Sequence, residues 1–391
     1  MTPNQVGDAI MERSRALVVA IVAGISLVVF NMMLDTKAAW SGVLVAALWG
    51  ISIAVGAGIF MAVNGVGGGT WWVGLHRHVS ALTQTLLVPL IALAAVLAVG
   101  FHAVYPGASH HGGGHGPAFS HAKEMWLSAP FFIGRAVIIA LIWVGVLAMM
   151  RRSVARFAAA PSRTTYGPYV RGSALFLLLL GPTISLAFFD WGMAVEPEWY
   201  STIYGFYGFA ASFQGAIAAI AAFALLSNAP AAQDPERRHN LGKLLFGFST
   251  FWAYIWLSQY MLIWYANLPE ETMHFLRRFS GDWAILFWLN VVVNFAVPFI
   301  VLLSAKAKRH TATLLQVSLV VLAGRWLDFY LLIAPPKGPF SFPYGALGAA
   351  LAVLAGMILV CGRAMQAKAV QSSVKSAADP AAQRMATPEQ A

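Results

Sequence analysis

Four charged side chains lie within or at the ends of the long apolar runs of this sequence. Arg325 and Asp328 stand three residues apart in "GRWLDFYLL", so on a helix they would share one face and could pair. Arg135 and Asp190 lie near the ends of two other apolar runs. A charge inside a membrane is unfavourable and usually faces the protein interior or a polar pathway. For Arg325 and Asp328 the pattern leaves two hypotheses: an ion pair that locks helices together, or a proton-conducting or quinone-headgroup site.

Two connections between apolar runs combine carboxylates with aromatic residues. "DWGMAVEPEWYSTIYG" contains Glu196 and Glu198, and "NLPEETMHFLRRFSGDW" contains Glu270 and Glu271. Pro197 fixes the backbone between the first two glutamates, which favours a shaped turn. The aromatic residues alone would fit a belt at the membrane interface. We interpret the four glutamates as the outer mouth of the pathway or as a docking surface.

The elements that must position these residues are membrane-spanning helices. The chain has 391 residues, of which 59% are hydrophobic and 10% are charged, whereas soluble domains carry about 25% charged residues. Ten apolar runs are long enough to cross a bilayer: 16–34, 40–62, 79–104, 130–150, 170–189, 200–227, 241–266, 283–304, 312–334 and 343–362. We expect an all-α polytopic membrane protein with one transmembrane domain (1–362) and a flexible cytoplasmic tail (363–391).

The basic residues predict how the chain is oriented. In the connections, together with the first three residues of the spans that follow them, 18 Lys and Arg side chains fall on the side that holds both termini, and five fall on the opposite side. Connections rich in Lys and Arg stay in the cytoplasm. Both termini are therefore expected in the cytoplasm. The two acidic connections and the 105–129 loop are expected on the outer face. On this interpretation the net charge of +10 reflects topology and not binding to nucleic acid.

Cysteine and histidine usage limits the redox centres that the chain could hold. Its only cysteine is Cys361, so no iron–sulfur cluster with cysteine ligands and no covalent haem attachment is expected. The histidines lie mostly in connections, which does not favour a transmembrane haem. The loop string "SHHGGGHGPAFSH" resembles a metal-binding tract by composition, but its glycines favour a mobile, solvated loop. Metal binding by the 105–129 loop stays open.

Three strings together carry a resemblance to a known family. They are "DWGMAVEPEWYSTIYG", "SQYMLIWYANLPEETMHFLRR" and "GRWLDFYLLIAPP". They resemble the F subunit of bacterial alternative complex III, a quinol:cytochrome c oxidoreductase, within the NrfD-like (polysulfide reductase membrane subunit) superfamily. The resemblance covers about the second to the tenth span. It implies two four-helix bundles flanked by two peripheral helices, in the bacterial cytoplasmic membrane.

The resemblance also implies partners and a role in a respiratory or photosynthetic chain. The expected partners are a homologous quinol-oxidising membrane subunit, a periplasmic iron–sulfur subunit, multihaem and monohaem cytochrome c subunits, and small membrane subunits. Haem c and iron–sulfur clusters would belong to those partners, and menaquinone or another quinone is the small molecule expected nearby. The chain itself would contribute a proton pathway, with Asp328, Arg325, Arg135 and Asp190 as pathway or quinol-site candidates.

Three other functions are kept as alternatives. The chain could oxidise quinol itself, with Asp190 as the acid, although no histidine in a span stands obviously opposite. It could be a secondary transporter, in which interrupted spans hold a solute near the middle of the membrane. It could also be a structural scaffold whose buried charges lock helices.

Overall fold

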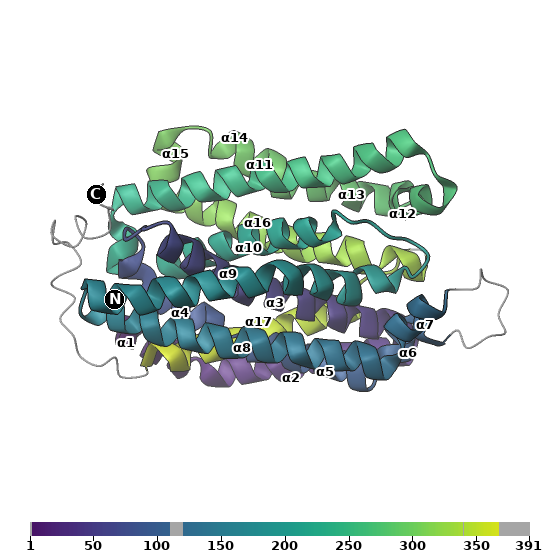
Figure 1. Ribbon diagram of the computed structural model, residues 1–391, viewed down its shortest axis with the longest axis horizontal. Helices are drawn as coiled ribbons and strands as arrows, with labels where there is room; N and C mark the ends of the chain where they lie inside the picture. The colour runs from purple at the N-terminus through teal and green to yellow at the C-terminus, as the bar shows by residue number, and fades with distance from the viewer. Residues whose placement is uncertain (1, 110–119, 339, 367–391) are drawn as a thin grey trace.

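The computed structural model describes residues 2–109, 120–338 and 340–366, and within them the chain is helical without strands. Figure 1 shows the long helices lying side by side. The α-helices are α1 (Pro3–Glu12), α2 (Ser14–Leu34), α3 (Thr36–Val66), α4 (His76–Gln84), α5 (Leu87–Ala98), α6 (Phe101–Val104), α7 (His121–Leu127), α8 (Ala129–Ala159), α9 (Arg163–Trp191), α10 (Tyr204–Leu226), α11 (Pro235–Ala266), α12 (Pro269–Phe279), α13 (Trp283–Val291), α14 (Val297–Val301), α15 (Ala305–Arg309), α16 (Thr311–Ile333) and α17 (Tyr344–Gln366).

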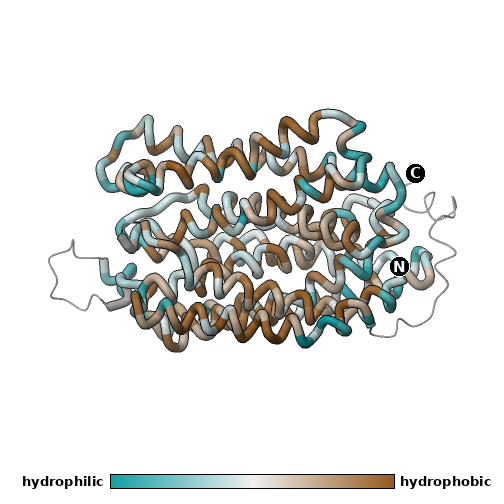
Figure 2. Tube along the Cα trace, turned by 180° about the vertical axis from the view of Figure 1, so that it is seen from behind, coloured by the Kyte–Doolittle hydropathy of each residue, from teal (hydrophilic) through white to brown (hydrophobic). Residues whose placement is uncertain are grey.

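Nine helical segments of the described chain are long and apolar enough to cross a membrane. They are Ser14–Leu34, Thr36–Val66, Val73–Ala98, Ala129–Ala159, Arg163–Val195, Tyr204–Leu226, Trp283–Val301, Thr311–Ile333 and Tyr344–Gln366. The tenth span expected from the sequence corresponds to α11, which has 32 residues and a length of about 48 Å. Its three Trp, three Tyr, two Ser and one Gln give it a lower mean hydropathy than the other nine segments. Figure 2 shows hydrophobic residues concentrated midway between two hydrophilic ends.

The connectivity shows that α11 must cross as well. At the two ends of the described chain, the Gln366 side chain donates a hydrogen bond to the Asp8 carboxylate at 2.7 Å, and α1 packs on α17. Both ends therefore lie at the same end of the helix bundle, which requires an even number of crossings. In Figure 1, α11 runs the length of the bundle. Ten crossings, as the sequence predicts, satisfy this condition.

The ten crossings form two four-helix groups and one peripheral pair. In the first group α3, α4–α5, α8 and α9 pack together, and in the second α10, α11, α13–α14 and α16 pack together. The peripheral helices α2 and α17 pack on each other, and α17 also covers α3. This arrangement confirms the expected two bundles with two flanking helices.

Small residues bring the central helices close. A Cβ atom added at Gly56 of α3 would overlap the Ser212 carbonyl of α10, so the two backbones touch where the bundles meet. Gly24 of α2 and Gly348 of α17 make a similar approach. Close approach through small residues is the usual way in which helices associate in membranes, where apolar side chains gain little by leaving lipid.

The C-terminal part of the chain differs slightly from expectation. The tail was predicted to begin at residue 363, but α17 continues to Gln366, and 367–391 lie outside the described residues. Cys361 is buried within α17. We call the end of the bundle that carries α7 and α12 the α12 end, and the opposite end, with α1 and α15, the α15 end (Figure 1).

Candidate functional site

The predicted pair Arg325 and Asp328 is present on α16 and is enclosed by protein. The Arg325 side chain is 0% exposed and that of Asp328 is 1% exposed. The Arg325 Nη1 atom lies 3.2 Å from Asp328 Oδ2. Each charge therefore offsets part of the other's desolvation cost, as two residues on one helix face can do.

Two neighbouring helices hold the other oxygen of Asp328. The Tyr207 hydroxyl of α10 donates to Asp328 Oδ1 at 2.5 Å, and the Asn290 amide of α13 donates to the same atom at 2.8 Å. The Arg325 guanidinium lies 4.2 Å from the centre of the Trp252 ring of α11, a cation–π arrangement. Residues from four spans thus meet at one carboxylate–guanidinium pair.

A π-helix supplies the next polar contact. Residues Val292–Ala296 form this segment between α13 and α14, and Asn294 within it accepts a hydrogen bond from Arg325 Nε at 2.7 Å. The Asn294 amide donates to Asn290 Oδ1 at 2.6 Å and to the Gly324 carbonyl at 2.9 Å. A Cβ atom at Gly324 would lie 2.6 Å from Asn294 Oδ1, so glycine is needed for this contact. π-Helical insertions are frequent at functional sites.

Several polar atoms of this cluster have no hydrogen-bond partner among the described residues. They are Arg325 Nη1 and Nη2, Asp328 Oδ2, and the Oε1 of Gln214, whose amide nitrogen donates to the Asn294 carbonyl at 2.8 Å. Arg325 Nη1 and Asp328 Oδ2 are close enough for an ion pair, but they are not aligned for a hydrogen bond. Buried polar atoms are nearly always partnered, so each exception calls for an explanation. A carboxylate that served only to lock helices would be expected to accept hydrogen bonds at both oxygens.

The structure also pairs Arg135 with Asp190, two candidates that the sequence analysis did not join. Arg135 of α8 donates to both oxygens of Asp190 on α9, from Nε at 2.7 Å and from Nη2 at 3.0 Å. Trp126 of α7 adds a third donor to Asp190 Oδ1 at 3.0 Å, and its ring lies 3.9 Å from the Arg135 guanidinium. Both oxygens of the carboxylate are used. The sequence hypothesis placed all four charges on one pathway, and the structure places them in two pairs on different bundles.

Glu196, a predicted outer-face residue, is the centre of a third cluster at the α12 end. It is 7% exposed. Its Oε1 atom lies 2.9 Å from His274 Nδ1 and accepts from Arg278 Nη2 at 2.8 Å, while Oε2 accepts from Arg277 Nη1 at 3.2 Å. Arg278 also donates to the carbonyls of Leu331 and Leu332. The cluster thus ties α12 and the end of α16 to the turn after α9.

The electrostatics of this cluster favour an ionised Glu196 beside a neutral His274. Burial acts to raise the pKa of Glu196, but the positive charge of Arg278 and the contact with His274 outweigh it and hold that pKa below its usual range. Burial first, and then the charge of the nearby Arg278, lower the pKa of His274 to about 4 against the opposing effect of Glu196. At neutral pH the imidazole is therefore uncharged.

A column of aromatic rings lies between the Glu196 cluster and Asp328. Trp199 stacks on His274 with ring centres 3.8 Å apart. Tyr204 follows, 5.6 Å from Trp199, and stacks on Tyr207 at 6.1 Å. Tyr207 donates to Asp328. All these rings are buried, so the two polar clusters are connected through packed aromatic side chains.

The remaining predicted glutamates do not join the cluster. Glu198 and Glu270 are exposed, and Glu271 is partly exposed. Glu270 and Glu271 occupy the first turn of α12, where negative charge offsets the helix dipole. Sequence reasoning missed His274 and Arg278, although both lie in "HFLRR", within the string that carried the family resemblance. Their spacing of four residues places them on one face of a helix.

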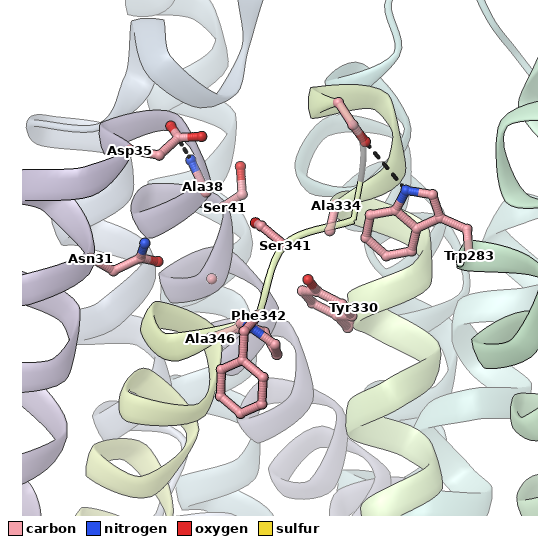
Figure 3. A pocket seen from close by; sticks show the side chains of 13 residues that line it. Asn31, Asp35, Ala38, Ser41, Trp283, Tyr330, Ala334, Ser341, Phe342 and Ala346 are labelled. Carbon is pink, nitrogen blue, oxygen red and sulfur yellow. Dashed lines mark hydrogen bonds between the residues drawn. The ribbon is translucent and has the colours of Figure 1, made fainter. Parts of the chain in front are cut away.

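One cavity lies near the α12 end, between the α2–α3 hairpin and the segment that leads into α17. Its volume is about 50 Å³, against roughly 300–1,000 Å³ for sites that enclose an organic ligand. Figure 3 shows Asn31, Asp35 and Ser41 on one side of it and Trp283 and Tyr330 on the other. A cavity of this size suits water and not a quinone ring. In the described part of the chain, no group of three or more His, Cys, Asp or Glu could hold a metal ion, and residues 110–119 of the histidine-rich loop lie outside that part.

Fold and site together define the chain as an all-α polytopic membrane protein with polar clusters buried among its spans. No protein-family model matches the sequence, and no curated protein matches it significantly.

Proposed function

We propose that this chain is a membrane subunit of a quinol-oxidising electron-transfer complex and that Asp328 exchanges protons within it. The observation that carries the proposal is the state of Asp328, whose Oδ1 is held by two donors while its buried Oδ2 has no hydrogen-bond partner in the described structure. The resemblance of three strings to the F subunit of alternative complex III supplies the context.

The chemistry follows from the two different oxygens. Tyr207 and Asn290 fix the orientation of the carboxylate, which leaves Oδ2 to accept and release a proton. Arg325, 3.2 Å away, offsets the negative charge of the carboxylate once the proton has left.

In this proposal the chain lies in the bacterial cytoplasmic membrane with both termini in the cytoplasm. The α12 end then faces the periplasm, where quinol protons are released. Glu198, Glu270 and Glu271, with the exposed Tyr200, form a docking surface for the iron–sulfur and cytochrome c subunits. Glu196, which the structure encloses, would support this surface from beneath.

The test is Asp328→Asn in the assembled complex, reconstituted in liposomes. Asparagine keeps the shape of the side chain but cannot take up a proton at neutral pH. We expect the rate of quinol-driven proton release to fall at least tenfold while the complex still assembles. The matched control is Asp35→Asn, the same change at an exposed helix cap, where asparagine also caps well. Wild-type proton release in Asp328→Asn would refute the role of Asp328.

A secondary transporter is the second candidate, because two spans are interrupted. The third span breaks at Thr85 and Leu86 between α4 and α5, and the span that contains α13 and α14 is interrupted by the π-helix. Broken spans are typical of transporter sites. Purification in mild detergent separates the two candidates. Co-purifying cytochromes favour the electron-transfer complex, whereas an isolated chain that takes up a solute in liposomes favours transport.

A further inference from the structure

A basic cluster at the α15 end has no part in the proton chemistry proposed above. It combines Lys243 on α11 with Lys308 and Arg309 on α15, and His239 lies between them. The Lys308 side chain packs against Gly242, where an added Cβ atom would lie 2.8 Å from Lys308 Cβ. Figure 1 shows α15 beside the first turns of α11. Two segments more than sixty residues apart thus bring their positive charges to one place.

Arg238 holds this arrangement without joining the cluster. Its Nε donates to the Arg309 carbonyl at 2.6 Å, and its Nη1 donates to the carbonyls of Ala232 and Gln233 at 2.8 and 2.7 Å. These bonds fasten α15 to the start of α11. The backbone that carries Lys308 and Arg309 is therefore held against the start of α11.

The cluster carries more positive than negative charge. Glu236 lies 3.0 Å from Arg309 and is the acid that contacts the group. Lys308 Nζ donates to the Leu303 carbonyl at 3.2 Å, which uses one of the three N–H groups of an ammonium. Burial and then the charge of Lys243 lower the pKa of Lys308. Burial, Arg309 and Lys243 likewise lower the pKa of His239, whose Nδ1 atom is buried without a partner in the described residues.

An exposed apolar surface adjoins these charges. Ile300 and Leu303, at the end of α14 and just after it, are 70% and 64% exposed. Leu303 also supplies the carbonyl that Lys308 contacts, and the Lys308 ammonium lies 5.0 Å from the centre of the Phe246 ring. Figure 2 shows hydrophobic residues continuing along the helices from the hydrophilic end. The surface thus changes from cationic to apolar within a few residues.

We propose that this cluster binds the phosphate headgroup of an anionic phospholipid, with its acyl chains lying along α14. A basic pocket at the membrane surface beside exposed apolar side chains matches both parts of such a lipid, whereas a free phosphate would use only the first. The exposed Lys243 contacts the phosphate, and Lys308, which is 8% exposed, adds positive potential beneath it together with Arg309.

The test measures lipid selectivity of the full chain in liposomes, in whatever complex it purifies with. Spin-labelled phosphatidylglycerol and phosphatidylcholine are compared for association with the wild type, with Lys243→Gln and with Lys243→Gln/Lys308→Gln. The matched control is Arg152→Gln/Arg156→Gln, which removes two exposed charges of α8 at the same end. Lys243 is exposed, so the single variant keeps the test valid if the double variant fails to fold.

We expect wild type to prefer phosphatidylglycerol and each lysine removed from the cluster to weaken that preference about fivefold. The control variant should retain the wild-type preference. An equal loss in the control variant would overturn the proposal, because it would indicate general attraction to a negative surface. Displacement of labelled phosphatidylglycerol by 10 mM inorganic phosphate would overturn the choice of a lipid as the ligand. Neither outcome depends on quinol or on proton release.

Discussion

The two buried arginine–aspartate pairs of this protein use the same residue types in opposite ways. Asp190 receives two hydrogen bonds from Arg135 and one from Trp126, so both its oxygens are engaged. Asp328 receives its hydrogen bonds at Oδ1, from residues other than its arginine, and keeps Oδ2 without one. The first pair is built as a structural tie between helices. In the second, Oδ2 contacts Arg325 at 3.2 Å without a hydrogen bond, and it is the acceptor that the proposed proton exchange would use.

The difference between the two pairs can be tested most directly at Arg135 and Asp190, which we call the closed pair because both carboxylate oxygens accept hydrogen bonds. Arg135→Met leaves Asp190 buried without its cation, and the expected loss of stability is about 3–5 kcal/mol. Unfolding in detergent, followed by circular dichroism against denaturant, measures it. The double variant Arg135→Met/Asp190→Leu should recover most of the loss because it buries no charge. If Arg135→Met were as stable as wild type, Asp190–Arg135 would not be a structural tie.

A third buried carboxylate, Glu196, makes a prediction about how the stability of the protein depends on pH. His274 has a folded-state pKa of about 4, below the value of about 6.5 for an exposed histidine. The unfolded state therefore binds the extra proton between these values, and stability should fall as pH falls from 6.5 to 4, by roughly 2–3 kcal/mol in total. The depressed pKa of Glu196 acts in the same direction at still lower pH.

The measurement is the melting temperature in detergent across this pH range. His274→Gln keeps a neutral hydrogen-bonding side chain beside Glu196 and should flatten the profile. The exposed His310 provides the control, because His310→Gln should leave the slope unchanged. A wild-type slope in His274→Gln would show that other groups cause the acid sensitivity.

The smallest expected effect concerns the hydroxyl that orients Asp328. Tyr207→Phe removes the donor to Asp328 Oδ1 but keeps the ring that stacks on Tyr204. We expect proton release by the assembled complex to slow about threefold, in line with the loss of roughly 1 kcal/mol from one hydrogen bond. Tyr105→Phe removes a buried tyrosine hydroxyl that binds the Trp191 carbonyl near the closed pair, and it should leave the rate unchanged. Equal slowing in both variants would contradict a specific role for Tyr207.

Local spacing made some of the site predictable. Arg325 and Asp328 are three residues apart on one helix, so their pairing needed no knowledge of the fold. The ten crossings followed from apolar length, and even α11, which is less apolar than the others, was found because its aromatic residues still form a continuous run. Features that depend on helix periodicity were therefore accessible from the sequence.

The partners that come from distant segments could not be predicted. Asp190 and Arg135 are 55 residues apart, so nothing in their spacing distinguished a closed pair from a member of the Asp328 pathway. His274 reaches Glu196 only because α12 folds back over the turn after α9, which places a residue of an apparent surface loop in the interior. Glu196 and Glu198 flank the same proline, yet one is enclosed and the other exposed.

The burial of Cys361 has a practical consequence for mapping this protein. Because the only cysteine of the chain lies inside α17, the natural sequence already serves as an unreactive background for thiol labelling. Single cysteines placed at the exposed positions Glu198 and Lys306 would then report on the two ends of the bundle separately. With the proposed orientation, a maleimide that cannot cross the membrane would react with the first in intact cells and with the second only after the cells are opened.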